Sequence, residues 1–234
     1  MTNEELRVKA LAKVKDKNFP VLSAVAYAIG AVTLIFADVT GIVALDIAIA
    51  MILGFATGLI ACSGYAKVGM DMWRHKQGDF PELFSCYKSL ETMKRGALPA
   101  ATYALMLVVL RYGVLSGVWY VALIAGVVCV LLQMMAFWGA YMTEMEDGEC
   151  PVKTYARGVK LAWKNIGRII GMKVYVYWWM AGIVGVAVWL CISNELPPVM
   201  SGLIVFLLGF VLRWMIGAFI ALAEAGVARE AYRG

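Results

Sequence analysis

The chain has 234 residues, of which 62% are hydrophobic, with a mean hydropathy of +0.78 and a formal net charge of +5. Soluble domains are about 45–50% apolar, so this composition excludes an ordinary soluble protein. The apolar residues are concentrated in long segments separated by short polar stretches, a distribution that is typical of an integral membrane protein.

Six apolar segments predict six transmembrane helices in an all-α fold. A bilayer core about 30 Å thick requires about 20 apolar residues of helix. Five segments reach or nearly reach this length, and the third is shorter. In chain order they span residues 19–36, 41–66, 97–112, 118–142, 169–192 and 199–223.

The basic residues predict the orientation of these spans. Apart from Arg111, Lys173 and Arg213, every Lys and Arg falls in the stretches 1–18, 67–96, 144–168 and 224–234. Cytoplasmic loops of membrane proteins are enriched in Lys and Arg, so we expect a multi-pass protein of the inner (plasma) membrane with both termini in the cytoplasm. The mixed charges at the N-terminus indicate an uncleaved anchor. This topology accounts for the net charge, so no nucleic-acid partner is expected.

The sequence indicates a single membrane domain with a threefold internal repeat. Residues 78–81 (GDFP) recur as residues 148–151 (GECP), and each motif follows an apolar run and opens a polar helix. A degenerate third copy lies near the N-terminus. Each unit is expected to contain an interfacial helix, a hinge, a span, a tight outer turn and a second span. The predicted units are 1–77, 78–147 and 148–234.

The polar helices are predicted to be amphipathic and to lie in the headgroup region of the membrane. One is expected between residues 83 and 93, and another between residues 152 and 168. The basic face of the latter consists of Lys153, Arg157, Lys160, Lys164 and Arg168. Such helices either brace the base of the bundle or dock a cytoplasmic partner. Hinges are expected at Pro20, Pro99 and Gly171, where Pro or Gly weakens helical continuity.

Arg213 and Asp46 are the candidate binding residues. Arg213 lies well inside the sixth apolar segment. An Arg at the centre of a bilayer costs about 2.5–3.5 kcal/mol on insertion scales, so it is expected to face the bundle interior or a wet cavity. Asp46, in the second segment, is the acidic candidate for its partner. The sequence leaves two roles for this pair, namely a structural contact that holds helices together and the binding of a substrate or ion.

Small residues recur every four positions in the second segment, at Ala50, Gly54, Gly58 and Cys62. Gly54 and Gly58 form a GxxxG motif, which allows two helix backbones to approach closely. The motif predicts close helix packing, either within one chain or in a homo-oligomer.

No catalytic, cofactor or metal-binding motif is evident. His75 is the only histidine, and the chain contains neither a P-loop motif nor a GxSxG motif. The five cysteines lack the spacing of zinc ligands, so neither a disulfide nor structural zinc is expected. The acidic residues of 144–149 favour a solvated loop over a cation site.

Several residues together resemble a known group of proteins. They are the two GDFP/GECP openings, Ala156 and Ala162 in the polar helix, Lys164-Asn165, and the aromatic start of the next span at 175–179. This pattern resembles a superfamily of small polytopic bacterial membrane proteins, related to the membrane domain found beside some glycerophosphodiester phosphodiesterases. The resemblance covers residues 80–234 and implies the fold more than a function, because most members lack a defined activity. No phosphodiesterase catalytic domain is present in this sequence.

The sequence therefore predicts a non-enzymatic membrane protein that serves in transport or as an accessory subunit of a membrane complex. Membrane lipid is the expected partner, together with further copies of the chain, other membrane subunits or a cytoplasmic protein. One alternative is the permease subunit of an exporter driven by a separate ATPase. Another is an interfacial lipid-modifying enzyme, which would depend on the acidic residues of 144–149.

Overall fold

The structure, a computed structural model, describes residues 2–14, 18–35, 40–74, 79–113, 118–146, 149–195, 198–212 and 217–233. Every regular element within these ranges is a helix, which confirms the expected all-α fold. In chain order the helices are α1 (Asn3–Val14), α2 (Asn18–Ile35), α3 (Val43–Gly58), the π-helix η1 (Leu59–Gly64), α4 (Tyr65–Trp73), α5 (Phe80–Leu83), the 3-10 helix η2 (Ser85–Tyr87), α6 (Leu90–Tyr112), α7 (Trp119–Met145), α8 (Pro151–Lys164), α9 (Ile166–Ser193), α10 (Pro198–Leu212) and α11 (Ala218–Arg233).

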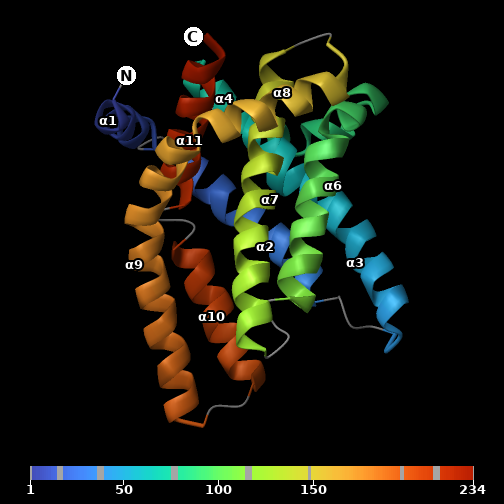
Figure 1. Ribbon diagram of the computed structural model, residues 1–234, viewed down its shortest axis with the longest axis vertical. Coiled ribbons are helices and arrows are strands. Elements are labelled where there is room, and N and C mark those ends of the chain that lie inside the picture. The colour runs from blue at the N-terminus through green and yellow to red at the C-terminus, as the bar shows by residue number, and fades with distance from the viewer. Residues whose placement is uncertain are drawn as a thin grey trace.

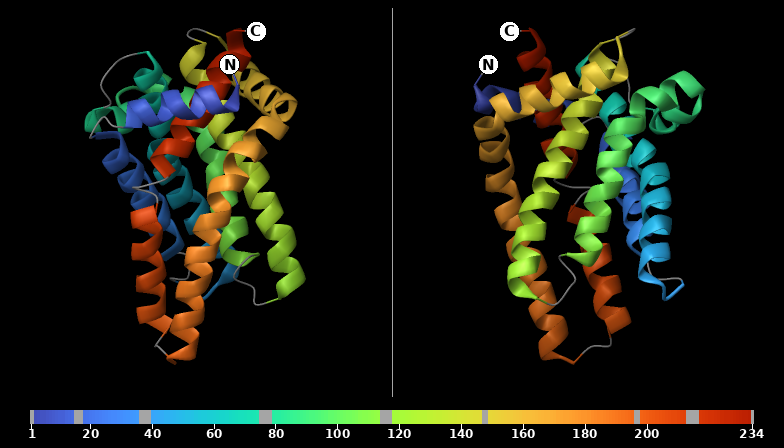
Figure 2. Two further views of the ribbon diagram at one scale, coloured as in Figure 1. Left: turned by 90° about the vertical axis from the view of Figure 1, so that its left-hand side faces the viewer. Right: turned by 45° about the vertical axis from the view of Figure 1, so that its right-hand side comes forward.

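The long helices run along a common direction, and two short helices lie across one end of them (Figure 1). We call this end, which contains α1, α5, α8 and the last turns of α11, the terminal end, because both chain termini lie there. The opposite, distal end contains the first turn of α3, the last turn of α6 and the tip of the α9–α10 hairpin (Figure 2).

Three helices in the described part of the chain are long and apolar enough to cross a membrane. They comprise Val43–Trp73, Leu90–Tyr112 and Tyr120–Met145, and a shorter apolar helix spans Phe19–Ala31. These long helices coincide with the second, third and fourth apolar segments of the sequence. The fold is therefore that of a helical protein with membrane-spanning capacity.

The first of these long helices is continuous but irregular. It consists of α3, η1 and α4, and the π-helix η1 interrupts the ordinary helical pattern. α3 packs closely on α6 through the two glycines of the GxxxG motif. A Cβ atom on Gly54 would lie 3.0 Å from Ala104 Cα, and one on Gly58 would lie 2.9 Å from the Ala100 carbonyl oxygen. The motif therefore lies at a contact within the chain.

One expectation about the polar helices is wrong. Residues 83–93 do not form one helix: α5 ends at Leu83, and α6 begins at Leu90 after Ser89, whose side chain caps the new helix. The expected hinge residues Pro20, Pro99 and Gly171 lie inside α2, α6 and α9, and the break between α8 and α9 falls at Asn165. Proline is tolerated in the first turn of a helix, which is where Pro20 lies. The threefold repeat stays a prediction.

The main hydrophobic core lies near the terminal end. Tyr65 stacks on Phe19 with ring centroids 5.3 Å apart, and Phe137 packs edge-on against Tyr65 at 6.5 Å. Trp138 and Leu6 are fully buried in the same core. Because Leu6 belongs to α1, this core holds the N-terminal helix firmly against the bundle.

Candidate functional site

A charged cavity of about 690 Å³ opens at the terminal end. Its walls come from α4, α5, η2, the first turns of α6 and the last turn of α7. The residues that line it are Lys67, Asp71, Arg74, Asp79, Glu82, Ser85, Cys86, Thr92, Arg95, Gly96, Thr143 and Glu144. We call it the charged cavity, because basic and acidic side chains both contribute to its lining.

One wall is formed by two ion pairs of Glu82 in α5, one with Lys67 of α4 and one with Lys88, which follows η2. Lys67 Nζ lies 2.7 Å from Glu82 Oε2, and Lys88 Nζ lies 3.4 Å from Glu82 Oε1. The hydrogen bond from Lys67 holds the pKa of Glu82 below its usual value. Glu82 therefore stays ionised at neutral pH and fixes the short helix α5 against α4.

A second wall is formed by the end of α4. Asp71 is buried, and its Oδ1 atom lies 3.6 Å from Nη1 of Arg74. Arg74 also donates through Nη2 to the carbonyl oxygen of Glu144, at 2.7 Å. These contacts join the end of α4 to the end of α7 and place a buried carboxylate beside the cavity.

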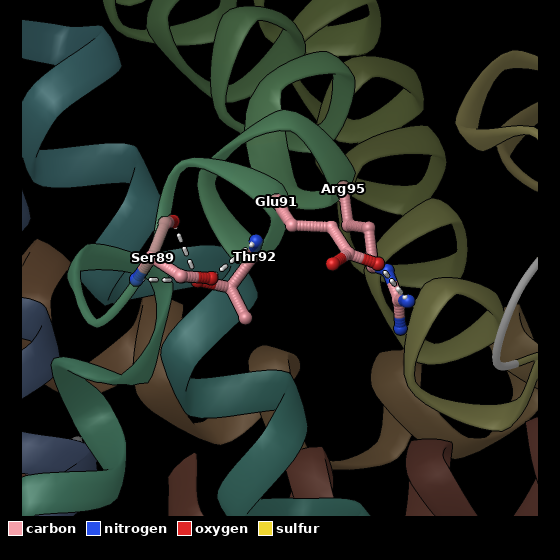
Figure 3. Close-up of polar contacts among 4 residues, drawn as sticks. All are labelled: Ser89, Glu91, Thr92 and Arg95. Carbon is pink, nitrogen blue, oxygen red and sulfur yellow. Dashed lines mark hydrogen bonds and ion pairs between the residues drawn. The ribbon is translucent and has the colours of Figure 1, made fainter.

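The first turn of α6 supplies the third wall (Figure 3). Ser89 Oγ accepts a hydrogen bond from the Thr92 backbone amide, and Thr92 Oγ1 accepts one from the Ser89 amide, both at 3.2 Å. This reciprocal capping box satisfies amides that a helix start otherwise leaves unpaired. Arg95 Nη2 donates to Glu91 Oε1 at 2.6 Å, one turn along the same helix. The cap and the ion pair together fix the positions of Thr92 and Arg95 in the cavity lining.

The floor of the cavity is chemically inert. Ser63, in the π-helix, donates through Oγ to the Gly96 carbonyl oxygen at 3.2 Å. Burial raises the pKa of the Cys86 thiol to about 11. Cys86 is therefore protonated at neutral pH and is a poor nucleophile, since the thiolate is the reactive form.

A second polar cluster lies deeper in the core, where α7, α9 and α11 meet. Lys173 Nζ lies 3.1 Å from Glu224 Oε2, and both side chains are almost fully buried. Trp138 donates through Nε1 to Glu224 Oε1, also at 3.1 Å. The available signal in the sequence was that Lys173 and Glu224 each lie where an apolar segment meets a basic stretch.

The structure describes only one of the two predicted binding residues. Asp46 is buried in the first turn of α3, near the distal end, and accepts hydrogen bonds from the Thr40 amide at 2.9 Å and the Thr40 hydroxyl at 2.8 Å. It therefore fixes the turn that precedes α3. Arg213 lies outside the described residues.

The basic face of α8 divides into two groups. Three of its lysines are exposed, namely Lys153, Lys160 and Lys164. Arg157 instead forms an ion pair with Glu146, and Arg168, at the start of α9, lies 3.1 Å from Glu230. The acidic residues of 144–149 likewise separate: Glu144 lines the charged cavity, Glu146 pairs with Arg157, and Asp147 lies outside the described residues.

The charged cavity presents groups of both charge signs. Its charged groups form ion pairs with both signs present, and among the described residues no group of three or more His, Cys, Asp and Glu side chains is placed to hold a metal ion. Carboxylate, ammonium and guanidinium groups can form charge-assisted hydrogen bonds with oppositely charged groups of a small solute.

Comparisons with known proteins found no relative of this chain. No family model, no curated protein and no solved structure matches it.

Proposed function

We propose that the protein is a six-span, non-enzymatic membrane protein that serves in transport and binds a small zwitterionic solute in the charged cavity. The observation that carries this proposal is the mixed charge of a cavity of about 690 Å³ beside three membrane-capable helices. Small-molecule sites have volumes of about 300–1,000 Å³ and place a few polar groups precisely.

The arrangement of charges favours a zwitterion over a simple ion. Lys67, Arg74 and Arg95 supply positive charge, and the cavity also holds Asp71 and Glu82. An ammonium group of the solute can approach Asp71 while its carboxylate approaches Arg95, because charge-assisted hydrogen bonds are the strongest of the polar contacts. A solute of a single charge would contact only one of these two sets of groups.

Binding can be measured by calorimetry on the purified protein in phosphatidylcholine nanodiscs. The probes are neutral amino acids as zwitterions, with tetramethylammonium and acetate as ions of a single charge. We expect saturable binding of at least one amino acid, and a loss of about tenfold or more in affinity for Asp71→Asn and for Arg95→Gln, because a hydrogen bond to a charged group contributes about 1.5–3 kcal/mol.

The matched control is Lys153→Gln, which removes a charge from exposed α8 outside the cavity. It is expected to leave amino-acid binding unchanged. Equal binding of all the probes, or equal affinities in wild type and both cavity variants, would contradict a zwitterion site.

Helix length supports one of the further proposed spans, and sequence composition supports two others. α9 has 28 residues, which at about 1.5 Å per residue exceeds a bilayer core of about 30 Å. α2 has 18 residues and α10 has 15, and both correspond to apolar segments of the sequence. Six spans place both termini on one side, which agrees with their common position at the terminal end.

The surroundings of α8 support a position at the membrane interface. Thr154 and Ala162 are buried against the bundle, whereas Val152 and Trp163 are exposed on a second side. The exposed lysines occupy a third side of the helix. A helix in the headgroup region needs these three environments, namely protein, acyl chains and charged headgroups or water.

The orientation can be tested with the exposed cysteine that precedes α8. Cys150 is exposed, whereas Cys62 and Cys86 are buried. In a variant that retains only Cys150, a membrane-impermeant maleimide is expected to label permeabilised cells but not intact cells, because the terminal end faces the cytoplasm. The control retains only an introduced Asn194→Cys, at the exposed end of the α9–α10 hairpin. Labelling of Cys150 in intact cells would reverse the proposed orientation.

A further inference from the structure

A second hollow of about 690 Å³ lies at the terminal end, between α1 and α11. Its lining includes Lys9 and Lys13 from α1, Arg229 and Arg233 from α11, and Trp73 from the end of α4. Glu230 is the one acidic residue in this lining. We call it the cationic groove. It shares none of its lining residues with the charged cavity.

Trp73 gives the groove a rigid base. Its indole Nε1 donates to the Leu222 carbonyl oxygen at 2.7 Å, which fixes the ring against α11. Lys13 Nζ lies 5.4 Å from the centre of the ring, within the range of a cation–π contact. The base is therefore held in place by contacts to two other helices.

Two of the cations also contact the end of α4. Lys13 Nζ donates to the Met72 carbonyl oxygen at 2.9 Å, and Arg229 Nη1 donates to the Trp73 carbonyl oxygen at 2.7 Å. Cations are favourable at a helix C-terminus, where carbonyl groups lack helical partners. These bonds position the cations but leave most of their donors available, since an ammonium group has three N–H donors and a guanidinium group has five.

Three cations of the groove have no ion pair in the described part of the chain. No carboxylate there forms an ion pair with Lys13, Arg229 or Arg233. Burial and the nearby Arg229 lower the pKa of Lys13. Burial lowers the pKa of Arg229, and Arg233 and Arg74 lower it further by repulsion. The helices thus hold like charges together, which an anion would relieve.

We propose that the cationic groove binds a phosphate group, carried either by an anionic phospholipid or by a soluble phosphate compound. Phosphate matches this site because its several oxygens can accept hydrogen bonds from cations on two helices at once. Guanidinium groups in particular donate in a fork that fits phosphate oxygens. The groove lies at the end of the bundle where a headgroup and a cytoplasmic solute can both reach it.

The first experiment measures pyrophosphate binding to the purified full-length protein in phosphatidylcholine nanodiscs, by calorimetry and by thermal stability. We expect saturable binding in the wild type and an affinity about tenfold or more lower in Arg229→Gln/Arg233→Gln, because each lost contact is charge-assisted. Arg229 also contacts α4, so Arg233→Gln alone is the second variant, and it is expected to weaken binding while the protein keeps its melting temperature.

The matched control is Lys160→Gln/Lys164→Gln, which removes the same charge from exposed α8. It should bind pyrophosphate as the wild type does. An equal loss in this control would show general charge attraction, and equal binding by the wild type and Arg233→Gln would exclude the groove. Either result overturns the proposal.

A second experiment distinguishes the two sources of phosphate. The wild type is placed in nanodiscs of phosphatidylcholine with phosphatidylglycerol, and pyrophosphate binding is measured again. Two results together assign the groove to a lipid headgroup. Phosphatidylglycerol competes with pyrophosphate, and it also stabilises the wild type but not Arg233→Gln. Unchanged pyrophosphate affinity in both kinds of nanodisc assigns it to a soluble phosphate compound.

Discussion

The terminal and distal ends of the bundle differ in what their side chains contact. Near the terminal end, Lys173 and Glu224 pair with only 10% and 6% of their side chains exposed. At the distal end, large apolar side chains face outward: Val43, Leu123 and Ile124 are exposed to 64%, 66% and 62%. The terminal end therefore holds buried charges in contacts within the chain. Exposed apolar side chains suited to lipid acyl chains occur at both ends, since Val8 and Val152 at the terminal end are exposed to 64% and 62%.

This difference indicates where binding chemistry can reside. Charged groups can be held in fixed positions only where neighbouring helices supply partners and exclude water. The terminal end meets this condition in the charged cavity and the cationic groove. The distal end has the polar contact between Asp46 and Thr40, which fixes a turn. Substitutions of charged residues should therefore have their largest effects near the terminal end.

The largest effect is expected for Lys173→Met, which leaves Glu224 charged and buried. Removing one partner of a buried ion pair costs about 3–5 kcal/mol. The double variant Lys173→Met/Glu224→Gln should regain most of this stability, because a Gln oxygen can still accept the hydrogen bond of Trp138. Thermal unfolding of the purified protein in a mild detergent measures both changes.

Leu123→Ala is the distal control for this pair of variants, and an exposed substitution of this kind should change stability by no more than about 0.5 kcal/mol. If Lys173→Met were no more destabilising than Leu123→Ala, the proposed difference between the two ends would not hold.

An intermediate effect is expected for Gly64→Ala. A Cβ atom on Gly64 would lie 1.9 Å from the Leu83 carbonyl oxygen, so α5 would have to move away from η1. Overpacking of this kind costs about 1–3 kcal/mol, and the movement would also displace Glu82 from the charged cavity. Thermal stability and amino-acid binding should both fall.

The control is Gly126→Ala in α7, where a Cβ atom would meet no atom within 4 Å. This substitution should raise stability by up to about 1 kcal/mol, because Ala favours helix more than Gly does. A gain in stability from Gly64→Ala would mean that α5 does not pack against η1.

The long apolar segments were the part of the fold that the sequence could predict. Their length and composition alone predicted the helices at Val43–Trp73, Leu90–Tyr112 and Tyr120–Met145, since a bilayer imposes a minimum length. The start of α6 was also encoded locally, because Ser89 and Thr92 have the spacing of a capping box. The alternation of apolar and polar residues instead predicts one polar helix over residues 83–93, which the structure divides before Leu90.

The contacts between charged residues could not be predicted from the sequence in the same way. Lys173 and Glu224 belong to different helices, and their pairing depends on how α9 and α11 are rotated against α7. The charged cavity likewise combines residues from α4, α5, α6 and α7. Hydrophobic periodicity gives the face of one helix but not its neighbour, so the arrangement of these charges required the structure.

The smallest effects are expected at the first turn of α6. Two substitutions there compare the contribution of the helix cap with that of an exposed ion pair. Ser89→Ala removes a cap and should cost about 1 kcal/mol, whereas Glu91→Gln removes an i,i+4 pair that contributes about 0.2–0.5 kcal/mol. Hydrogen exchange provides the more local measurement, because the Thr92 amide donates to Ser89 Oγ. Its exchange should accelerate in Ser89→Ala and change little in Glu91→Gln. If the Thr92 amide exchanged at the same rate in the wild type, Ser89→Ala and Glu91→Gln, then tertiary contacts, and not the cap, would hold this wall of the charged cavity in place.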